Sequence, residues 1–299
     1  MRQDPPNESL ILDKFTHDDL KAWRRRANDL DNYNVQLFYH LQGQRQIHHD
    51  SLIAALKSST HVSMNAEQWV RIVDFKYADN PLSPKGSLIN GGRFNIGSDL
   101  DKFPRFPALY VGEDEATVRS ERFGTPKIAN GLQDHELALR KLPSFGFLNL
   151  KVNLGCVFDL TQTSNLRAFS EIIRKFTTTK ELRALARKLG QHATLVHNER
   201  ELHKTFLHPE WRHYPTQYEI PANPQVFGNF VNAAKFAGVL YPSVRAAGKK
   251  CIAVFPQNFS DTDYVELSDA AHSGVKFKKM TVDNWEEIAN WRPSALSAE

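Results

Sequence analysis

The sequence lacks the features that mark membrane, secreted or disulfide-bonded proteins. None of its apolar runs approaches the roughly 20 residues that a membrane-spanning helix needs. Only two cysteines occur, Cys156 and Cys251, and each lies within an apolar run, which favours buried free thiols over a disulfide. The N-terminal residues do not form a secretory signal, so we expect a soluble protein of the cytoplasm.

Common nucleotide- and metal-binding motifs are also absent. The sequence contains no GxGxxG after a predicted strand and no GxxxxGK[ST], which excludes Rossmann and P-loop sites. HExxH and CxxC are missing too, and no metal site is predicted. Four histidines recur at steps that do not align them on one helix face, so we expect loop or surface positions for His197, His203, His208 and His213. The net charge of +4 is too small to indicate a nucleic-acid-binding protein.

The chain is long enough for a substantial core, and its composition is that of a globular protein: 299 residues, of which 41% are hydrophobic and 24% charged. Residues 1–65 carry apolar residues at helical spacing, for example Trp23 and Ala27, and predict a helical N-terminal extension. The arginines at 24–26 predict a solvated helix face, with contact to a partner or a phosphate as the alternative. Residues 66–299 are predicted to form the main domain.

The main domain mixes strands and helices without regular alternation, which favours an α+β fold over a doubly wound sheet. Alternation of apolar and polar residues predicts a strand over 148–153, and short apolar runs predict strands over 70–73, 108–111, 156–160, 238–241, 251–255 and 264–267. It predicts helices over 114–123 with Asp114 as N-cap, over 165–189 with Gly190 as the C-terminal stop, and over 227–234. Residues 191–225 are expected to be mostly loop.

The most informative segment is Gly91-Gly92-Arg93-Phe94-Asn95, which precedes the predicted strand containing Tyr110. Adjacent glycines allow close backbone approach to a ligand or positive φ, and Arg93 supplies a charged fork suited to a diphosphate. Glu121 lies on the helix expected after the strand, and only its spacing distinguishes it from Glu113 and Glu115. An arginine, an aromatic hydroxyl and a carboxylate are what cleavage of a dinucleotide's glycosidic bond requires.

These residues, with the later Tyr241-Pro242-Ser243-Val244, resemble the RES-domain family, best known as toxins of bacterial toxin–antitoxin pairs. The resemblance covers about residues 69 to 260. It implies a fold similar to ADP-ribosyltransferase toxins, with a split β-sheet core and peripheral helices. It also implies an NAD glycohydrolase or NAD phosphorylase, which uses NAD as substrate and needs no cofactor. A neutralising antitoxin or immunity protein and a homodimer are implied as partners, whereas a membrane or a nucleic acid is not expected.

The resemblance assigns roles to individual residues. The catalytic residues would be Arg93, Tyr110, Glu121 and Ser243, and the substrate-binding residues would be Arg71, Gly92, Asn95 and Asn258. Nicotinamide leaves NAD as a neutral amide, so no general acid is needed, and a carboxylate such as Glu121 would stabilise the ribosyl cation. Arg71 and Arg93 would hold the diphosphate, Tyr110 would stack on nicotinamide or orient ribose, and Ser243 would bond a phosphate or Glu121.

Three additions separate the sequence from a minimal domain of this family: residues 1–65, a loop over 98–107, and a helical insertion around 165–190. Two alternatives stay open. One is ADP-ribosylation of a macromolecule, which Arg119 disfavours because related transferases carry an acceptor-positioning carboxylate two residues before the catalytic one. The other is a non-catalytic module that binds a partner through the N-terminal and 165–189 helices.

Overall fold

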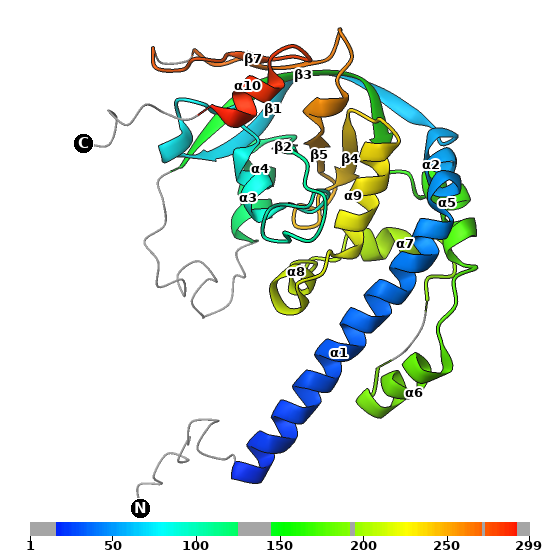
Figure 1. Cartoon of the computed structure of the whole chain (residues 1–299). Coiled ribbons are helices and arrows are strands. Elements are labelled where there is room, and N and C mark those ends of the chain that lie inside the picture. The colour runs from blue at the N-terminus through cyan, green and yellow to red at the C-terminus, as the bar shows by residue number, and fades with distance from the viewer. Residues whose placement is uncertain (1–15, 125–144, 192–194, 271–272, 292–299) are drawn as a thin grey trace, which may run out of the picture. The chain divides into compact units, whose positions relative to one another are not determined.

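The computed structural model describes residues 16–124, 145–191, 195–270 and 273–291 (Figure 1). The chain divides into two compact units. The smaller unit comprises Met1–Ile47 and Phe176–Leu195, and the larger comprises His48–Lys175 and Val196–Glu299. The boundary expected at residue 65 remains a prediction. Within the described residues, no helix has the length and apolarity needed to span a membrane.

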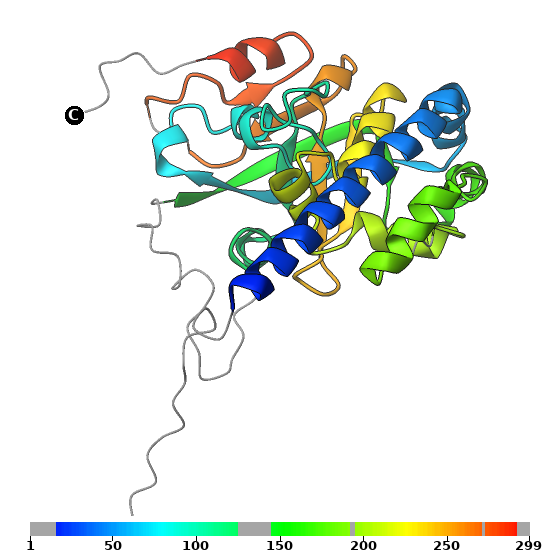
Figure 2. The ribbon, with the colours of Figure 1, turned by 60° about the horizontal axis from the view of Figure 1, so that its bottom comes forward.

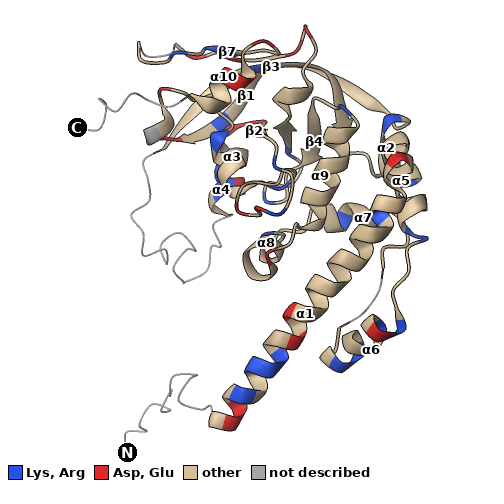
Figure 3. Ribbon diagram, in the orientation of Figure 1, with Lys and Arg blue, Asp and Glu red and all other residues tan. Residues whose placement is uncertain are grey.

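The smaller unit pairs helix α1 (His17–Ile47) with helix α6 (Lys180–Leu189). Tyr33 of α1 packs among the apolar residues of α6, and Lys188 forms an ion pair with Asp29 at 2.8 Å. Charged residues of both signs gather towards the start of α1 (Figure 3). The arginines at 24–26 are exposed, as expected for a solvated helix face.

The prediction of a single helix over 165–189 is wrong. The structure instead contains a 3₁₀ turn, η3 (Thr163–Leu166), followed by α5 (Arg167–Ile173) and then α6. The break coincides with three consecutive threonines, and β-branched residues lower helix propensity. Thr179, the last of them, caps α6 by accepting the Leu182 N–H at 3.2 Å. Gly190 ends α6 at a φ of 69°, as predicted.

The larger unit is built on a seven-stranded mixed sheet in the order β1-β2-β5-β4-β3-β6-β7. The strands are β1 (His61–Asp74), β2 (Leu109–Gly112), β3 (Phe145–Asp159), β4 (Gly238–Pro242), β5 (Lys250–Val254), β6 (Tyr264–Leu267) and β7 (Lys279–Met280). Because β1 pairs with both β2 and β3, five strands form a closed circuit. Only the β3–β4 pairing is parallel among those described. The α+β prediction is confirmed.

Two strand predictions differ from the structure. Residues 148–153 and 156–159 belong to one strand, β3, rather than to two neighbours. Gly155 does not interrupt the strand, because its N–H donates to Asp263 Oδ1 at 2.6 Å. The strand expected over 70–73 extends from His61 to Asp74, since bulges near Val62 and Ala66 keep it paired with β3.

The remaining described helices surround this sheet. They are α2 (His49–Lys57), η2 (Phe75–Tyr77), α3 (Lys85–Asn90), α4 (Glu115–Phe123), α7 (Glu199–Phe206), α8 (His213–Tyr218), α9 (Asn223–Ala233), η4 (Pro256–Asn258) and α10 (Trp285–Asn290). The expectation of loop over 191–225 is therefore wrong for α7 and α8. Asn198 starts α7 by accepting two N–H groups, and the buried Leu202 and Phe206 hold it against the core. Helix α9 packs on β4 (Figures 1 and 2).

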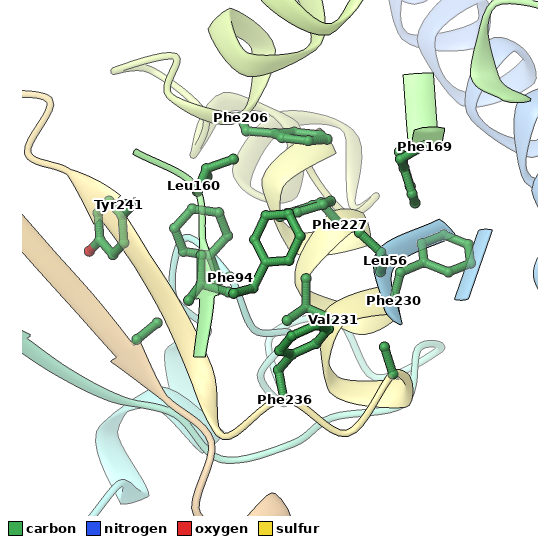
Figure 4. Packing of buried hydrophobic residues seen from close by; sticks show 14 of the residues in the cluster. Leu56, Phe94, Leu160, Phe169, Phe206, Phe227, Phe230, Val231, Phe236 and Tyr241 are labelled. Carbon is green, nitrogen blue, oxygen red and sulfur yellow. The ribbon is translucent and has the colours of Figure 1, made fainter. Parts of the chain in front are cut away.

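An aromatic core between α9 and the sheet fixes the segment that carries the glycine–arginine motif. Phe227 of α9 stacks on Phe206 with ring centroids 4.2 Å apart (Figure 4). Phe94 is fully buried beside it and meets Tyr241 edge-on at 4.9 Å. A Cβ on Gly228 would lie 1.9 Å from the Phe94 carbonyl oxygen, so only glycine permits this approach. The motif is thus pressed directly against α9.

Candidate functional site

The glycine–arginine motif forms a tight loop directly after α3. Gly91 adopts a φ of 59°, which favours glycine, and the Gly92 N–H donates to the Asn95 carbonyl at 3.0 Å. A Cβ on Gly92 would lie 2.3 Å from the Tyr110 hydroxyl oxygen. The second glycine is therefore needed so that the phenol of β2 can lie against the loop.

Tyr110 ties the loop to the sheet through its hydroxyl. The Phe94 N–H donates to this oxygen at 2.9 Å, and the hydroxyl donates to Asn95 Oδ1 at 2.9 Å. Burial raises the pKa of Tyr110 well above its usual value, which keeps the hydroxyl protonated. The Asn95 amide donates to the carbonyls of Ser87 and Phe106, each at 2.9 Å. Asn95 is thus occupied in holding the loop.

Arg93 is oriented by main-chain carbonyls rather than by an acid. Its Nη1 donates to His208 O at 2.8 Å and to Phe206 O at 3.3 Å, and its side chain is almost fully buried. Its guanidinium also lies 5.9 Å from the ring centroid of Trp211. Within the described part of the chain, no carboxylate forms an ion pair with Arg93. A buried, oriented and unneutralised guanidinium is suited to an anion.

Glu121 is held on α4 by a cluster of donors from the turn after β4. Its Oε1 accepts the Ser243 hydroxyl at 2.6 Å, the Val244 N–H at 2.8 Å and the Arg245 N–H at 3.2 Å. The Ser243 oxygen itself accepts the Ala246 N–H at 2.9 Å. With its proton directed to Glu121 and its lone pair in use, the Ser243 hydroxyl positions the carboxylate.

A second connection clamps α4 to the same β4–β5 hairpin. Asp114 caps the helix, as predicted, by accepting the Thr117 N–H at 2.8 Å. Its other oxygen pairs with Lys249 at 2.8 Å. The bond to Lys249 and then those to Thr117 lower the pKa of Asp114 to about 2. Both ends of the hairpin turn are therefore fixed relative to Glu121.

These elements enclose a cavity of about 680 Å³. Arg93, Tyr110 and Glu121 all line it, together with Gly92. Ser243 lies behind Glu121 as its hydrogen-bond donor. Three predicted residues from the glycine loop, β2 and α4 thus share one cleft although they are spread over 29 positions of the sequence, from residue 93 to residue 121.

Three other predicted residues are not part of the cavity lining: Arg71, Asn95 and Asn258. Arg71 donates to the Ser83 carbonyl at 2.8 Å, and burial, with a contribution from Arg122, lowers its pKa to about 10. The Asn258 amide donates to Phe236 O at 2.9 Å and to Asn232 O at 3.0 Å. Because these side chains bind main-chain carbonyls, Arg71, Asn95 and Asn258 stabilise the segments around the cavity and do not line it.

Further residues of the cavity were not among the predicted site residues: Arg122, Trp211, Arg212, Tyr241 and Arg245. Arg122 forms an ion pair with Asp74 at the end of β1. Trp211 is buried, and the Arg212 guanidinium lies 4.5 Å from its ring centroid. The adjacent aromatic and cationic residues at 211–212 are the one sequence signal for this part of the site. His213, expected on a loop or the surface, begins α8 and lines the cavity as an exposed side chain.

The cavity carries an excess of positive charge. Four arginines line it, against two carboxylates, Glu121 and Glu210. Arginine forks bind phosphate oxygens well, and a concave site concentrates their field. A volume of this size is typical of sites for small molecules and cofactors. The site therefore suits a phosphate-bearing small molecule with a cationic centre near Glu121.

One of three comparisons with known proteins, the match to a protein-family model, agrees with the family resemblance. None of the curated proteins matches the sequence significantly. Among solved structures, the chain is similar to one described as the crystal structure of the M. tuberculosis MbcT–MbcA toxin–antitoxin complex. The identity is 16% and the TM-score 0.43, over 80% of this chain and 97% of that one. The model of the RES domain matches residues 68–272, which is more than half of the sequence. The chain therefore belongs to the RES domain family.

Proposed function

We propose that this protein degrades NAD by cleaving the bond between nicotinamide and ribose, with a core related to the split sheet of ADP-ribosyltransferase toxins. The observation that supports this proposal most is the shared cavity of Arg93, Tyr110 and Glu121, with Ser243 bonded to Glu121. The buried arginine and the surplus of positive charge suit the diphosphate of NAD. The carboxylate suits the sugar from which nicotinamide departs.

In this reaction the bond between ribose C1′ and the nicotinamide nitrogen breaks, and its electron pair stays with the neutral leaving group. An oxygen of water or inorganic phosphate then bonds to C1′, and a proton is released to solvent when water reacts. Glu121 stabilises the positive charge that develops on the ribose. Because Ser243, Val244 and Arg245 hold one oxygen of Glu121, the carboxylate needs little reorganisation during the reaction.

In this proposal Tyr110 helps to place the substrate and takes no part in proton transfer. Its hydroxyl is committed to Phe94 and Asn95 and stays protonated, so it neither donates nor accepts a proton during catalysis. The part of its ring that lines the cavity offers a flat surface for nicotinamide or ribose. Gly92 and Asn95 serve the same end by fixing the loop against that ring.

Release of nicotinamide from NAD by the purified full chain tests the proposal. Glu121→Gln keeps the shape of the side chain but removes its charge, and we expect at least a 100-fold loss of kcat, which is about 2.7 kcal/mol of transition-state stabilisation. Glu115→Gln is the matched control, because Glu115 lies on the same helix but is exposed and paired with Arg119. Equal activity of Glu121→Gln and the control would refute the mechanism.

The acceptor is open between water and phosphate. Separating ADP-ribose from its phosphorylated form, after reaction with and without inorganic phosphate, distinguishes a glycohydrolase from a phosphorylase. Labelling of a protein or nucleic acid by NAD would instead indicate a transferase. That alternative is disfavoured because Arg119, two residues before Glu121, pairs with Glu115 and lies over the Phe147 ring.

We further propose a bacterial cytoplasmic setting and a neutralising partner, an antitoxin or immunity protein, because unrestrained NAD loss would kill the cell that makes the enzyme. A homodimer is proposed from the family resemblance. Relief of growth arrest by a co-expressed neighbouring gene, and loss of that arrest in Glu121→Gln, would support this setting. A non-catalytic module would cause the same arrest with and without the Glu121 charge.

A further inference from the structure

One face of the cavity presents two guanidinium groups on a single indole. Trp211 is 7% exposed, so its ring is fixed in place. Arg93 and Arg212 lie 5.9 and 4.5 Å from its ring centroid. Both arginines line the cavity, as does Trp211. The indole thus serves as a common support for two permanently charged forks.

The positive charges of Arg93 and Arg212 are only weakly balanced by negative charges nearby. Among the described residues neither forms an ion pair with a carboxylate, although the Tyr110 phenol and the Asp99 carboxylate both act on the charge of Arg212. The Arg212 side chain keeps access to solvent, and partial desolvation followed by the neighbouring charges of Arg93 and Arg245 lowers its pKa. Like charges gathered at one place are costly until an anion neutralises them. A diphosphate supplies two negative charges on adjacent groups.

Arg71, the residue that the family resemblance offers as the second arginine, is less suited to this task. Its guanidinium donates to the Ser83 carbonyl and is not part of the cavity lining. The adjacent Arg122 does line the cavity, but it is paired with Asp74. Among the described residues, Arg212 has neither a hydrogen bond to a carbonyl, as Arg71 has, nor an ion pair with a carboxylate, as Arg122 has.

We propose that Arg212, supported by Trp211, is the second diphosphate-binding arginine of this site and acts together with Arg93. The inference rests on the proposed function, since NAD is the ligand that carries the diphosphate. It assigns to the segment between α7 and α8 a role in binding the substrate. Arg71 then braces β1 against the Ser83 turn instead of touching the ligand.

Steady-state kinetics of Arg212→Ala and Arg212→Lys on NAD test the inference. A hydrogen bond between charged groups corresponds to about a 10-fold or larger effect on binding. We therefore expect Arg212→Ala to raise KM for NAD about 10-fold or more, with kcat changed less than about 3-fold. Arg212→Lys should recover only part of the loss, because a lysine keeps the charge but not the planar fork. Arg200→Ala is the matched control, because Arg200 is exposed on α7 and outside the cavity lining.

Calorimetry with ADP-ribose separates this inference from the proposed function. If the full chain cleaves NAD but Arg212→Ala leaves KM and ADP-ribose affinity unchanged, the inference is overturned and the function stands. If the full chain does not cleave NAD, the function fails. In that case weaker ADP-ribose binding by Arg212→Ala, with unchanged binding by Arg200→Ala, still supports Arg212 as the diphosphate ligand. Absence of ADP-ribose binding by the unaltered chain overturns it.

Discussion

Removal of the Ser243 hydroxyl gives the sharpest test of how the carboxylate is held. In Ser243→Ala, Glu121 Oε1 loses its shortest donor, at 2.6 Å, and keeps the N–H groups of Val244 and Arg245 at 2.8 and 3.2 Å. A hydrogen bond to a charged group contributes about 1.5–3 kcal/mol net. Because two donors remain, we expect the lower part of this range, about 1.5–2 kcal/mol, which is about a 10- to 30-fold loss of kcat/KM.

The same substitution affects stability, because the Ser243 oxygen also accepts the Ala246 N–H at 2.9 Å. We expect a decrease of about 1 kcal/mol in the free energy of unfolding, measured by urea denaturation. Nicotinamide release at a temperature where the variant is fully folded then isolates the catalytic effect. Ser268→Ala is the control, because the exposed Ser268 hydroxyl donates to the Glu67 carbonyl at 3.3 Å, just after β6 and away from the cavity lining.

Two outcomes would refute the reasoning. Activity within twofold of the unaltered chain would mean that Ser243 does not position Glu121. A loss as complete as that of Glu121→Gln, in a folded protein, would mean that the hydroxyl acts on the substrate itself. Ser243→Thr, which keeps a hydroxyl, should retain more activity than Ser243→Ala if positioning is the role.

Two further substitutions probe the loop and the helix that carry the site. Gly92→Ala places a Cβ 2.3 Å from the Tyr110 hydroxyl, so we expect a loss of about 1–3 kcal/mol of stability and most of the NAD cleavage. The added Cβ would also lie 2.4 Å from two ring carbons of Tyr110. Urea denaturation should therefore show that adding Tyr110→Ala, which removes the whole ring, costs less in Gly92→Ala than in the unaltered chain; strictly additive losses would contradict this. Asp114→Ala removes the α4 cap and should cost about 1 kcal/mol at pH 7. Because the pKa of Asp114 falls from 3.8 unfolded to about 2 folded, this difference is present above about pH 4 and disappears as the pH falls through about 2. A difference that does not decrease between pH 5 and pH 3 would argue against the cap.

Local signals were sufficient for much of the fold. Short apolar runs identified β2, β5 and β6, and the capping residue Asp114 marked the start of α4. Local signals failed where a residue distant in the sequence forms a hydrogen bond with a backbone group. Gly155 resembles a strand end in the sequence, but Asp263, more than a hundred positions away, accepts its N–H and β3 continues. No local pattern contains that information.

The residues of the candidate site could likewise be predicted only in part from the sequence. Arg93, Tyr110 and Glu121 could be selected from a short motif, and the structure brings them to one cavity. Arg212 could not, because it reaches the cavity through tertiary contacts such as the bond from Arg93 to His208, 115 positions along the chain. Conversely, Arg71 matches the motif by position, but its bond to Ser83 depends on how the following loop folds back.

The smaller unit is assembled from two stretches that lie far apart in the sequence, and this affects how the protein can be shortened. Removing residues 1–47 alone would leave α6 without α1, with Leu182, Ala186 and Leu189 exposed to water. Removing 1–65 would also delete Leu52 and Leu56, which are fully buried in the aromatic core of the larger unit. A shortened chain that stays soluble should therefore start at His48 and replace residues 176–195 with a short linker.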